Sequence, residues 1–434
     1  MNETVGFVGL GILVLLIGLR VPIGVALIGV SFGGIWALIG LPSAVGILRI
    51  APYNFAANWQ LSSVPMFLFM GFLCYHAGIT RGLFEAARVW LSRLPGGLAI
   101  ASIFGAAGFA ALTGSSVACA AAMGRIAVPE MMRSRYNPAL ATGTVAAAGT
   151  IGALIPPSIL FIIFGILAQQ PISKLFLGGA AAGILTAASY VAVVFVWCTL
   201  RPSAAPRVTE TFGWNERFRT LMLILPALVL AAAVFGGLFS GIFTPTEAGA
   251  VGSGIALVIA VGMRTLTWEC FKNSVIESFA TSAALFIIAI GANLLTRFVA
   301  LSGAGDALAE LIIQVSGHPA LLLAGITLIY FVLGMFLDPM GAMLLTLPIL
   351  LPIANEAGFD MIWFGVILAK LLEIGMITPP VGLNVFVIKS VLGDSVELST
   401  IFKGVTVFIL ADLLVVVLLM AFPDIILFLP RVAG

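Results

Sequence analysis

The amino-acid sequence predicts an all-α membrane protein that crosses the bilayer many times. Of its 434 residues, 61% are hydrophobic and 9% are charged, whereas about a quarter of the residues in a soluble domain are charged. Apolar runs long enough to cross about 30 Å of hydrocarbon recur along the chain, with 221–239 and 404–423 among the clearest. Residues 1–4 contain no Lys or Arg, so we expect a retained first span from Val5 and no cleavable signal peptide.

Composition and motifs exclude several classes of function. The net charge is +2 with no basic tract, so nucleic acid is not an expected partner. The chain carries no nucleotide-binding P-loop, which argues against ATP-driven pumping. The cysteines and histidines lack the spacing of a disulfide, haem or zinc site: Cys74, Cys119, Cys198, Cys270, His76 and His318. An intramembrane serine protease is disfavoured because neither histidine has a suitable context.

The sequence contains an internal duplication at a fixed offset, the one that carries Pro22 onto Pro245. Chance predicts about half of one proline coincidence at such an offset. Four are found: Pro22 with Pro245, Pro129 with Pro352, Pro156 with Pro379 and Pro157 with Pro380. We therefore predict a first repeat over 1–200, a linker over 201–220 and a second repeat over 221–434.

Loop charges predict that the two repeats run in opposite directions across the membrane. Basic residues lie within 81–93 and 133–135 in the first copy, whereas the matched stretches 302–316 and 356–360 are acidic and contain no basic residue. Because cytoplasmic loops accumulate Lys and Arg, corresponding loops are expected on opposite sides. The linker carries four arginines and is expected in the cytoplasm, where its part from Thr211 is either a short surface helix or a solvated connector. An inverted repeat is typical of secondary transporters, and a parallel duplication is the alternative.

Two apolar runs are interrupted at equivalent places, which predicts two re-entrant helical hairpins. The first polar tip is at 113–116 (TGSS) and the second is at 338–341 (DPMG). Non-helical backbone at membrane depth is tolerated where protein or a water-filled cavity satisfies it. Both tips are therefore expected at a shared buried site, with Ser115, Ser116 and Asp338 as candidate substrate contacts.

Each tip is followed by a glycine placed four residues before a double proline. These segments are 152–157 (GALIPP) and 375–380 (GMITPP). Proline cannot donate a backbone hydrogen bond and disfavours helix in the residue before it, so both segments should unwind and free carbonyl oxygens. Freed carbonyls suit Na+, and half-helix N-termini suit an anionic substrate. Proline kinks used for packing alone are the alternative.

Charged residues within the apolar runs need partners or a function. Arg297, like Asp338, is a candidate for the substrate path, whereas Glu247 is expected to cap a helix. Structural pairing is expected for the others, with Lys370 and Glu373 on one helix, Arg125 and Glu130 near the first tip, and Asp412 within the last span.

Several long segments resemble the DctM-type large membrane subunit of tripartite ATP-independent periplasmic (TRAP) transporters. They are TGSSVACAAAMGRIAVPEMMRSRYNP, TIGALIPPS, FTPTEAGAVG, LDPMGAMLLTLPILLPI, ITPPVGLNVFV and FPDIILFLP, and the resemblance covers essentially the whole chain. The resemblance implies a multi-pass protein of the bacterial inner membrane. Its implied partners are a small four-span membrane subunit and a periplasmic substrate-binding protein.

The resemblance also implies Na+-driven uptake of an organic acid, such as a C4-dicarboxylate or a sialic acid, by an elevator-type movement of both hairpins. Carried over by motif, the first Na+ site would use Thr113, Gly152, Ile155 and Pro157. The second would use Asp338, Gly341, Gly375, Thr378 and Pro380. The chain departs from many relatives by having Thr113 where they have Ser, and Cys119 where some have an acidic residue. A stand-alone ion-coupled organic anion transporter of the same plan is the alternative function.

Overall fold

The computed structural model describes residues 2–206, 213–305, 307, 310 and 319–432. All secondary-structure elements in these ranges are α-helices or short 3-10 helices. The first half of the chain forms α1 (Asn2–Gly18), α2 (Ile23–Ile39), α3 (Leu41–Ala56), η1 (Trp59–Ser62), α4 (Ser63–His76), α5 (Arg81–Leu91), α6 (Gly97–Thr113), α7 (Ser116–Arg133), α8 (Pro138–Gly149), η2 (Thr150–Ala153), α9 (Ile159–Leu167), α10 (Ile172–Leu200) and η3 (Pro202–Ala204).

The second half forms α11 (Trp214–Phe239), α12 (Pro245–Gly262), α13 (Trp268–Ser302), α15 (Pro319–Phe336), α16 (Pro339–Glu356), α17 (Met361–Gly375), α18 (Leu383–Leu392), η4 (Gly393–Ser395), α19 (Leu398–Ala421) and α20 (Asp424–Val432). Among the described residues, six helices are long and apolar enough to cross a membrane: α10, α11, α12, α13, α16 and α19. The prediction of an all-α multi-pass chain is thus confirmed at the level of its helices.

Helix boundaries recur at the offset found in the sequence. α7 begins at Ser116 and α16 at Pro339, and α8 begins at Pro138 and α17 at Met361. The starts within each pair are separated by the same interval as the matched prolines. The copies differ at α13, which runs without a break over the region that matches α3, η1 and α4.

Sequence features explain where individual helices begin. Asn137 accepts hydrogen bonds from the backbone of Ala139 and Leu140 and precedes Pro138, a favourable first residue of α8. Thr244 and Glu247 form a reciprocal capping box at the start of α12. The prediction that Glu247 caps a helix is confirmed.

The part of the linker after Thr211 was expected to be a short surface helix or a solvated connector, and its described residues from Trp214 form neither as a separate element. Residues 211 and 212 lie outside the described residues, and from Trp214 the chain is already part of α11, which continues to Phe239. A helix that has started extends at little cost, so this polar first turn joins the span behind it. The Trp90 indole on α5 also donates to the Arg217 carbonyl and holds this turn against the bundle.

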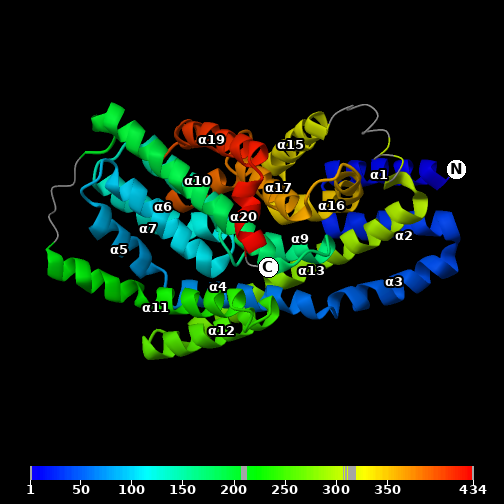
Figure 1. Ribbon diagram of the computed structural model, residues 1–434, viewed down its shortest axis with the longest axis horizontal. Coiled ribbons are helices and arrows are strands. Elements are labelled where there is room, and N and C mark those ends of the chain that lie inside the picture. The colour runs from blue at the N-terminus through cyan, green and yellow to red at the C-terminus, as the bar shows by residue number, and fades with distance from the viewer. Residues whose placement is uncertain (1, 207–212, 306, 308–309, 311–318, 433–434) are drawn as a thin grey trace.

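The core is centred on helices that are buried along almost their whole length. All residues of α17 except Ile362 are buried, and so are ten of the twelve residues of α8. α17 lies near the middle of the molecule, and α10 runs from there toward the side that holds α5, α6 and α7, with α1, α2 and α16 on the opposite side (Figure 1). α17 packs against α10, α15, α16 and α19.

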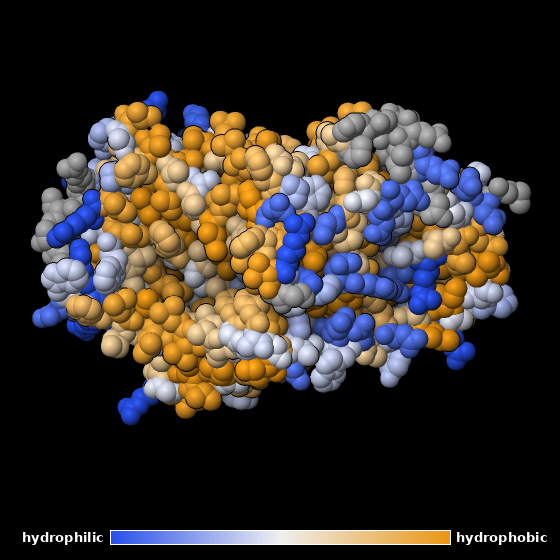
Figure 2. Space-filling model, viewed as in Figure 1, coloured by the Kyte–Doolittle hydropathy of each residue, from blue (hydrophilic) through white to orange (hydrophobic). Residues whose placement is uncertain are grey.

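The outer surface of the bundle is apolar. Large hydrophobic side chains are exposed on α1, α10, α11, α12 and α19, including Val14, Ile184, Met222, Val258 and Leu410. Figure 2 shows one face that is apolar over α10, α11 and α12, with hydrophilic residues gathered right of the centre. A continuous apolar surface of this extent suits contact with lipid.

Candidate substrate and cation site

The first helix break is a tight turn between α6 and α7. Gly114 ends α6 in the left-handed region at φ 62°, and Ser115 then adopts an extended conformation and caps α7. The Ser115 hydroxyl accepts a 3.4 Å hydrogen bond from the Ala118 backbone. A Cβ on Gly114 would lie 2.0 Å from the Pro157 carbonyl oxygen, so the tip touches the first double proline. Only glycine combines this backbone angle with this close approach.

The first double-proline segment unwinds, as its sequence predicts. After α8 the chain forms one turn of 3-10 helix, η2, and then irregular backbone up to Ser158, which caps α9. A Cβ on Gly152 would lie 2.9 Å from the Ser115 carbonyl oxygen. Ile155 packs its side chain against Gly183 of α10. The structure therefore brings the tip and the Gly152–Pro157 segment together.

The second break has the same local design but different neighbours. α15 ends at Phe336 and α16 begins at Pro339, where the Asp338 carboxylate accepts from the backbone of Met340 and Gly341. The Cβ position of Gly341 lies close to two side chains, those of Asp338, which caps the helix, and of Ile23 on α2.

The second double-proline segment contacts another part of the molecule. Gly375 lies against Gly334 of α15, with its Cβ position 2.4 Å from that residue's backbone. The Thr378 hydroxyl donates to the Ile374 carbonyl. Pro380 is exposed whereas the matching Pro157 is buried. Residues of the first predicted cation set thus touch the first tip, whereas Gly341 and Gly375 of the second set make their closest approaches to different neighbours.

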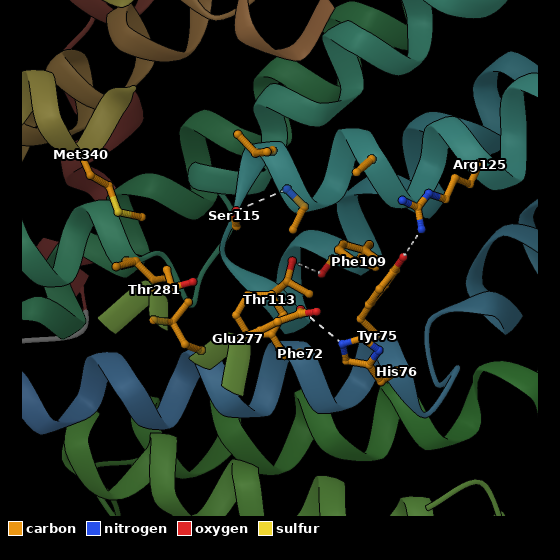
Figure 3. A pocket seen from close by; sticks show the side chains of 16 residues that line it. Phe72, Tyr75, His76, Phe109, Thr113, Ser115, Arg125, Glu277, Thr281 and Met340 are labelled. Atoms are coloured by element: carbon orange, nitrogen blue, oxygen red, sulfur yellow. Dashed lines mark hydrogen bonds and ion pairs between the residues drawn. The ribbon is translucent and has the colours of Figure 1, made fainter. Parts of the chain in front are cut away.

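A cavity of about 640 Å³ lies beside the first tip. Its lining combines Thr113 and Ser115 of the first break with Met340 of the second. The remaining lining comes from α4, α6, α7, α9 and α13: Leu68, Gly71, Phe72, Tyr75, His76, Phe109, Val117, Ala118, Ala121, Arg125, Ile159, Glu277 and Thr281. In Figure 3 Met340 and Arg125 lie at opposite ends of the view, with Thr113 and Ser115 between them.

Several polar residues of this cavity were not among the sequence candidates for the site. Arg125 was expected to pair with Glu130, but its guanidinium donates to the Tyr75 hydroxyl at 3.1 Å. His76 has no carboxylate at metal-ligand spacing in the sequence, and in the structure its Nε2 lies 3.2 Å from Glu277 of α13, at ion-pair distance without hydrogen-bond alignment. No sequence signal links these residues, because α4 and α13 are far apart in the chain.

Glu130 is taken by other arginines. Its carboxylate lies 2.7 Å from Arg88 Nη1 and 3.8 Å from Arg133 Nη1. The expected pairing failed because the Glu130 side chain points toward α5 and not along its own helix to Arg125. Arg125 is thereby left facing the cavity.

The remaining predicted substrate residues are not in the lining of the cavity, and Arg297 is more than four helical turns along α13 from the lining residue Thr281. Ser116 is buried and donates to Glu373 Oε2 at 2.6 Å. Asp338 caps α16 two residues before the cavity-lining Met340. Arg297 is exposed on α13, where its Nε donates to Asn293.

The buried charged side chains of α17, Lys370 and Glu373, are bonded to residues of other helices. Lys370 Nζ lies 2.5 Å from Asp412 Oδ1 of α19, so the expected pairing of Lys370 with Glu373 is wrong. Asp412 Oδ2 also accepts from the Tyr190 hydroxyl, which in turn contacts Thr150. Glu373 accepts a hydrogen bond from Ser116 at the first tip and makes none with Lys370.

No group of three or more His, Cys, Asp or Glu side chains that could hold a metal gathers in the described part of the chain. The four cysteines are free and buried. The oxygens near the two breaks are backbone carbonyls, hydroxyls and carboxylates. Such hard ligands suit an alkali cation better than a transition metal.

The sequence matches a defined transporter family over nearly its whole length. Residues 10–425 match the DctM component of tripartite ATP-independent periplasmic transporters. The chain belongs to this family. The resemblance recognised in its motifs is confirmed.

Curated relatives share about a third of their residues with this TRAP large permease. It is 34% identical to the C4-dicarboxylate TRAP transporter large permease DctM of Pseudomonas aeruginosa, over 83% of this chain and 84% of that protein. It is 32% identical to the sialic acid large permease SiaM of Vibrio cholerae, over 94% and 95%. The isethionate permease DctMQ of Oleidesulfovibrio alaskensis is 31% identical, over 91% of this chain and 65% of that longer protein.

Solved structures of transporters share the fold. The YdaH transporter of Alcanivorax borkumensis superposes with a TM-score of 0.61 at 14% identity, covering 88% of this chain and 89% of that one. MtrF of Neisseria gonorrhoeae gives a TM-score of 0.52 at 15% identity, covering 89% and 86%. At these identities the likeness concerns architecture.

Proposed function

We propose that this large permease imports an organic acid together with Na+ by an elevator mechanism. The observation that carries the proposal is the cavity beside the first break, which Met340 of the second break also lines. Two interrupted helices at one cavity are typical of the binding sites of secondary transporters.

The cavity has the features that an organic anion requires. Its volume lies within the range of small-molecule sites, roughly 300–1,000 Å³. The N-terminus of α7 faces it through Ser115, and a helix N-terminus attracts negative charge. The Arg125 guanidinium can meet a carboxylate, and Phe72 and Phe109 offer contact to carbon atoms.

Na+ is the proposed coupling ion. We propose the first site at Thr113, Gly152, Ile155 and Pro157, where irregular backbone presents carbonyl oxygens beside the tip. The second site is proposed at Asp338, Gly341, Gly375, Thr378 and Pro380. In this second set Gly341, Gly375 and Thr378 are buried, whereas Asp338 and Pro380 are exposed.

The alternating mechanism rests on the two matched copies. Two observations support repeats of inverted topology. Helix starts recur at the interval of the matched prolines, and corresponding loops carry opposite charges. An inverted pair gives outward-open and inward-open states of similar energy. The proposed movement carries both breaks past helices such as α4 and α13, with the arginine-rich linker in the cytoplasm.

The proposed assembly lies in the bacterial inner membrane. It includes a small four-span membrane subunit and a periplasmic binding protein that delivers the substrate. The relatives named for C4-dicarboxylates and sialic acid support an organic acid as the cargo. A stand-alone ion-coupled organic anion transporter is the second candidate, and it differs by retaining uptake when the binding protein is withheld.

The experiment is uptake into liposomes that contain the permease with its small subunit, with the cognate binding protein outside. A binding screen on that soluble protein identifies the labelled acid. We expect accumulation driven by an inward Na+ gradient and lost without the binding protein. Uptake that is unchanged when K+ replaces Na+ at constant voltage would contradict the coupling.

A further inference from the structure

Glu373 is a completely buried carboxylate with half of its hydrogen-bonding capacity unused. Its side chain is 0% exposed. Oε2 accepts a 2.6 Å bond from Ser116, the first residue of α7, whereas Oε1 is buried without a partner. An ionised carboxylate accepts several hydrogen bonds in water, so this oxygen has lost solvation that no described protein group replaces.

The neighbouring charges do not neutralise Glu373. Lys370 and Asp412 are also 0% exposed, and they bind each other at 2.5 Å. Two buried carboxylates therefore share one buried ammonium, and when both carboxylates are ionised one negative charge is left over. The N-terminus of α7 offsets about half an elementary charge. A proton on Glu373 or a bound cation must offset the remainder, because an unpaired charge in the hydrocarbon region is costly.

A second unsatisfied oxygen lies near the same turn of α7. Asn384 of α18 is 0% exposed, its Nδ2 donates weakly to the Ala146 carbonyl, and its Oδ1 is buried without a partner. Its Nδ2 lies 3.1 Å from the Cβ position of Gly149, and that position is 2.9 Å from Ala120 Cβ. Ala120 is one turn beyond Ser116, so the side chains of Glu373 and Asn384, each with one unsatisfied oxygen, both lie beside the first two turns of α7.

This turn has two different faces. Val117, Ala118 and Ala121 line the substrate cavity, whereas Ser116 and Ala120 are buried on the side of Glu373 and Asn384. An ion on the buried side therefore lies directly behind the wall of the cavity. Its binding would fix the turn whose other side meets the cargo.

We infer that Glu373 and Asn384 form a buried site for one alkali cation behind the first helix break. The inference rests on the proposed Na+ coupling. It adds a third site, whose ligands include a carboxylate, to the two proposed Na+ sites, which consist largely of backbone carbonyl oxygens. Glu373 Oε1 supplies the charge, and Asn384 Oδ1 supplies a neutral ligand. Oxygen ligands of this kind suit Na+.

The test is direct binding of radioactive ²²Na+ to the purified complex of large and small subunits. Glu373→Gln keeps the shape and the bond from Ser116 but removes the charge. We expect it to bind one Na+ fewer than the wild type, or to bind that ion at least about tenfold more weakly. Glu356→Gln, on the exposed end of α16, is the matched control and should bind as the wild type does.

Uptake separates a cation ligand from a packing residue. With Glu373→Gln, the Na+ concentration for half-maximal uptake should rise, while the KM for the cargo at saturating Na+ should change little. Asn384→Ala should shift the same Na+ dependence in the same direction, and it decides the question if Glu373→Gln does not fold.

Two results would overturn the inference. Equal Na+ stoichiometry and affinity in the wild type and in both variants would mean that a proton or a water molecule satisfies Glu373. Binding of ²²Na+ that K+ displaces equally well would remove the assignment to a Na+ coupling ion. Na+-independent uptake by the wild type would instead refute the proposed function and leave the binding result to stand separately.

Discussion

At the residue scale, the buried ion pair of Lys370 and Asp412 illustrates how this protein keeps charges inside an apolar bundle. Both side chains are 0% exposed, and Asp412 also accepts from Tyr190. The pair joins α17 to α19, and the Tyr190 hydroxyl extends the network to Thr150 beside the first unwound segment. Its energetic role is clearest when one partner is removed.

Lys370→Met should lower the free energy of unfolding by about 3–5 kcal/mol, because Asp412 would remain buried without its counter-charge. The double variant Lys370→Met with Asp412→Leu should recover most of that loss, since two apolar side chains replace the pair. Thermal denaturation of the purified complex in detergent measures both. A double variant that is less stable than Lys370→Met alone would contradict this role.

Sequence reasoning succeeded for residues whose partners are local. Glu247 and Thr244 are three positions apart, so their capping box follows from helix geometry. The partner of Lys370 was missed because Asp412 is 42 positions away on another helix. Arg125 was likewise assigned to Glu130, although its contact, Tyr75, lies 50 positions earlier.

At the scale of elements, the first break is held by contact between two non-helical segments. The Cβ position of Gly114 lies 2.0 Å from the Pro157 carbonyl oxygen, and that of Gly152 lies 2.9 Å from the Ser115 carbonyl oxygen. The glycines therefore permit the tip to approach backbone that the double proline leaves outside a helix. Close approach of backbone oxygens is also what a cation site needs.

Gly114→Ala should abolish uptake because the new methyl group would meet the Pro157 carbonyl. The left-handed backbone adds about 1–2 kcal/mol of strain for alanine. The matched control is Gly254→Ala on α12, where no atom lies within 4 Å of the added Cβ. Na+-driven uptake in liposomes is the measurement, and full activity of Gly114→Ala would refute the tight tip.

The ends of helices could be predicted where the sequence carries strong helix-breaking signals. The polar tips and double prolines marked the ends of α6, α15, α8 and α17 within a few residues. The full lengths of α11 and α13 were harder to predict. The polar first turn of α11 contains no residue that ends a helix, and neither does the long run of α13. Their extent depends on packing against α5, α2 and α4.

At the scale of the whole molecule, duplication was visible in the sequence because prolines mark fixed points in both copies. The recurrence of helix boundaries at the same interval agrees with it. The cavity was not visible, because it depends on how α4, α7 and α13 pack together. These helices are far apart in the sequence, so their contact cannot be predicted from it. The charged residues that face the cavity are likewise determined by tertiary packing.

The central claim is that the cavity beside the first break holds the cargo. Ala118→Cys places a thiol in its wall, and the native cysteines are buried. The decisive measurement is the rate at which a membrane-impermeant methanethiosulfonate modifies this thiol in the purified complex, with Ser395→Cys as an exposed control. We predict that the transported acid with Na+ slows modification at 118 and leaves the control unchanged. A rate at 118 that is the same with and without cargo and Na+ would contradict the claim.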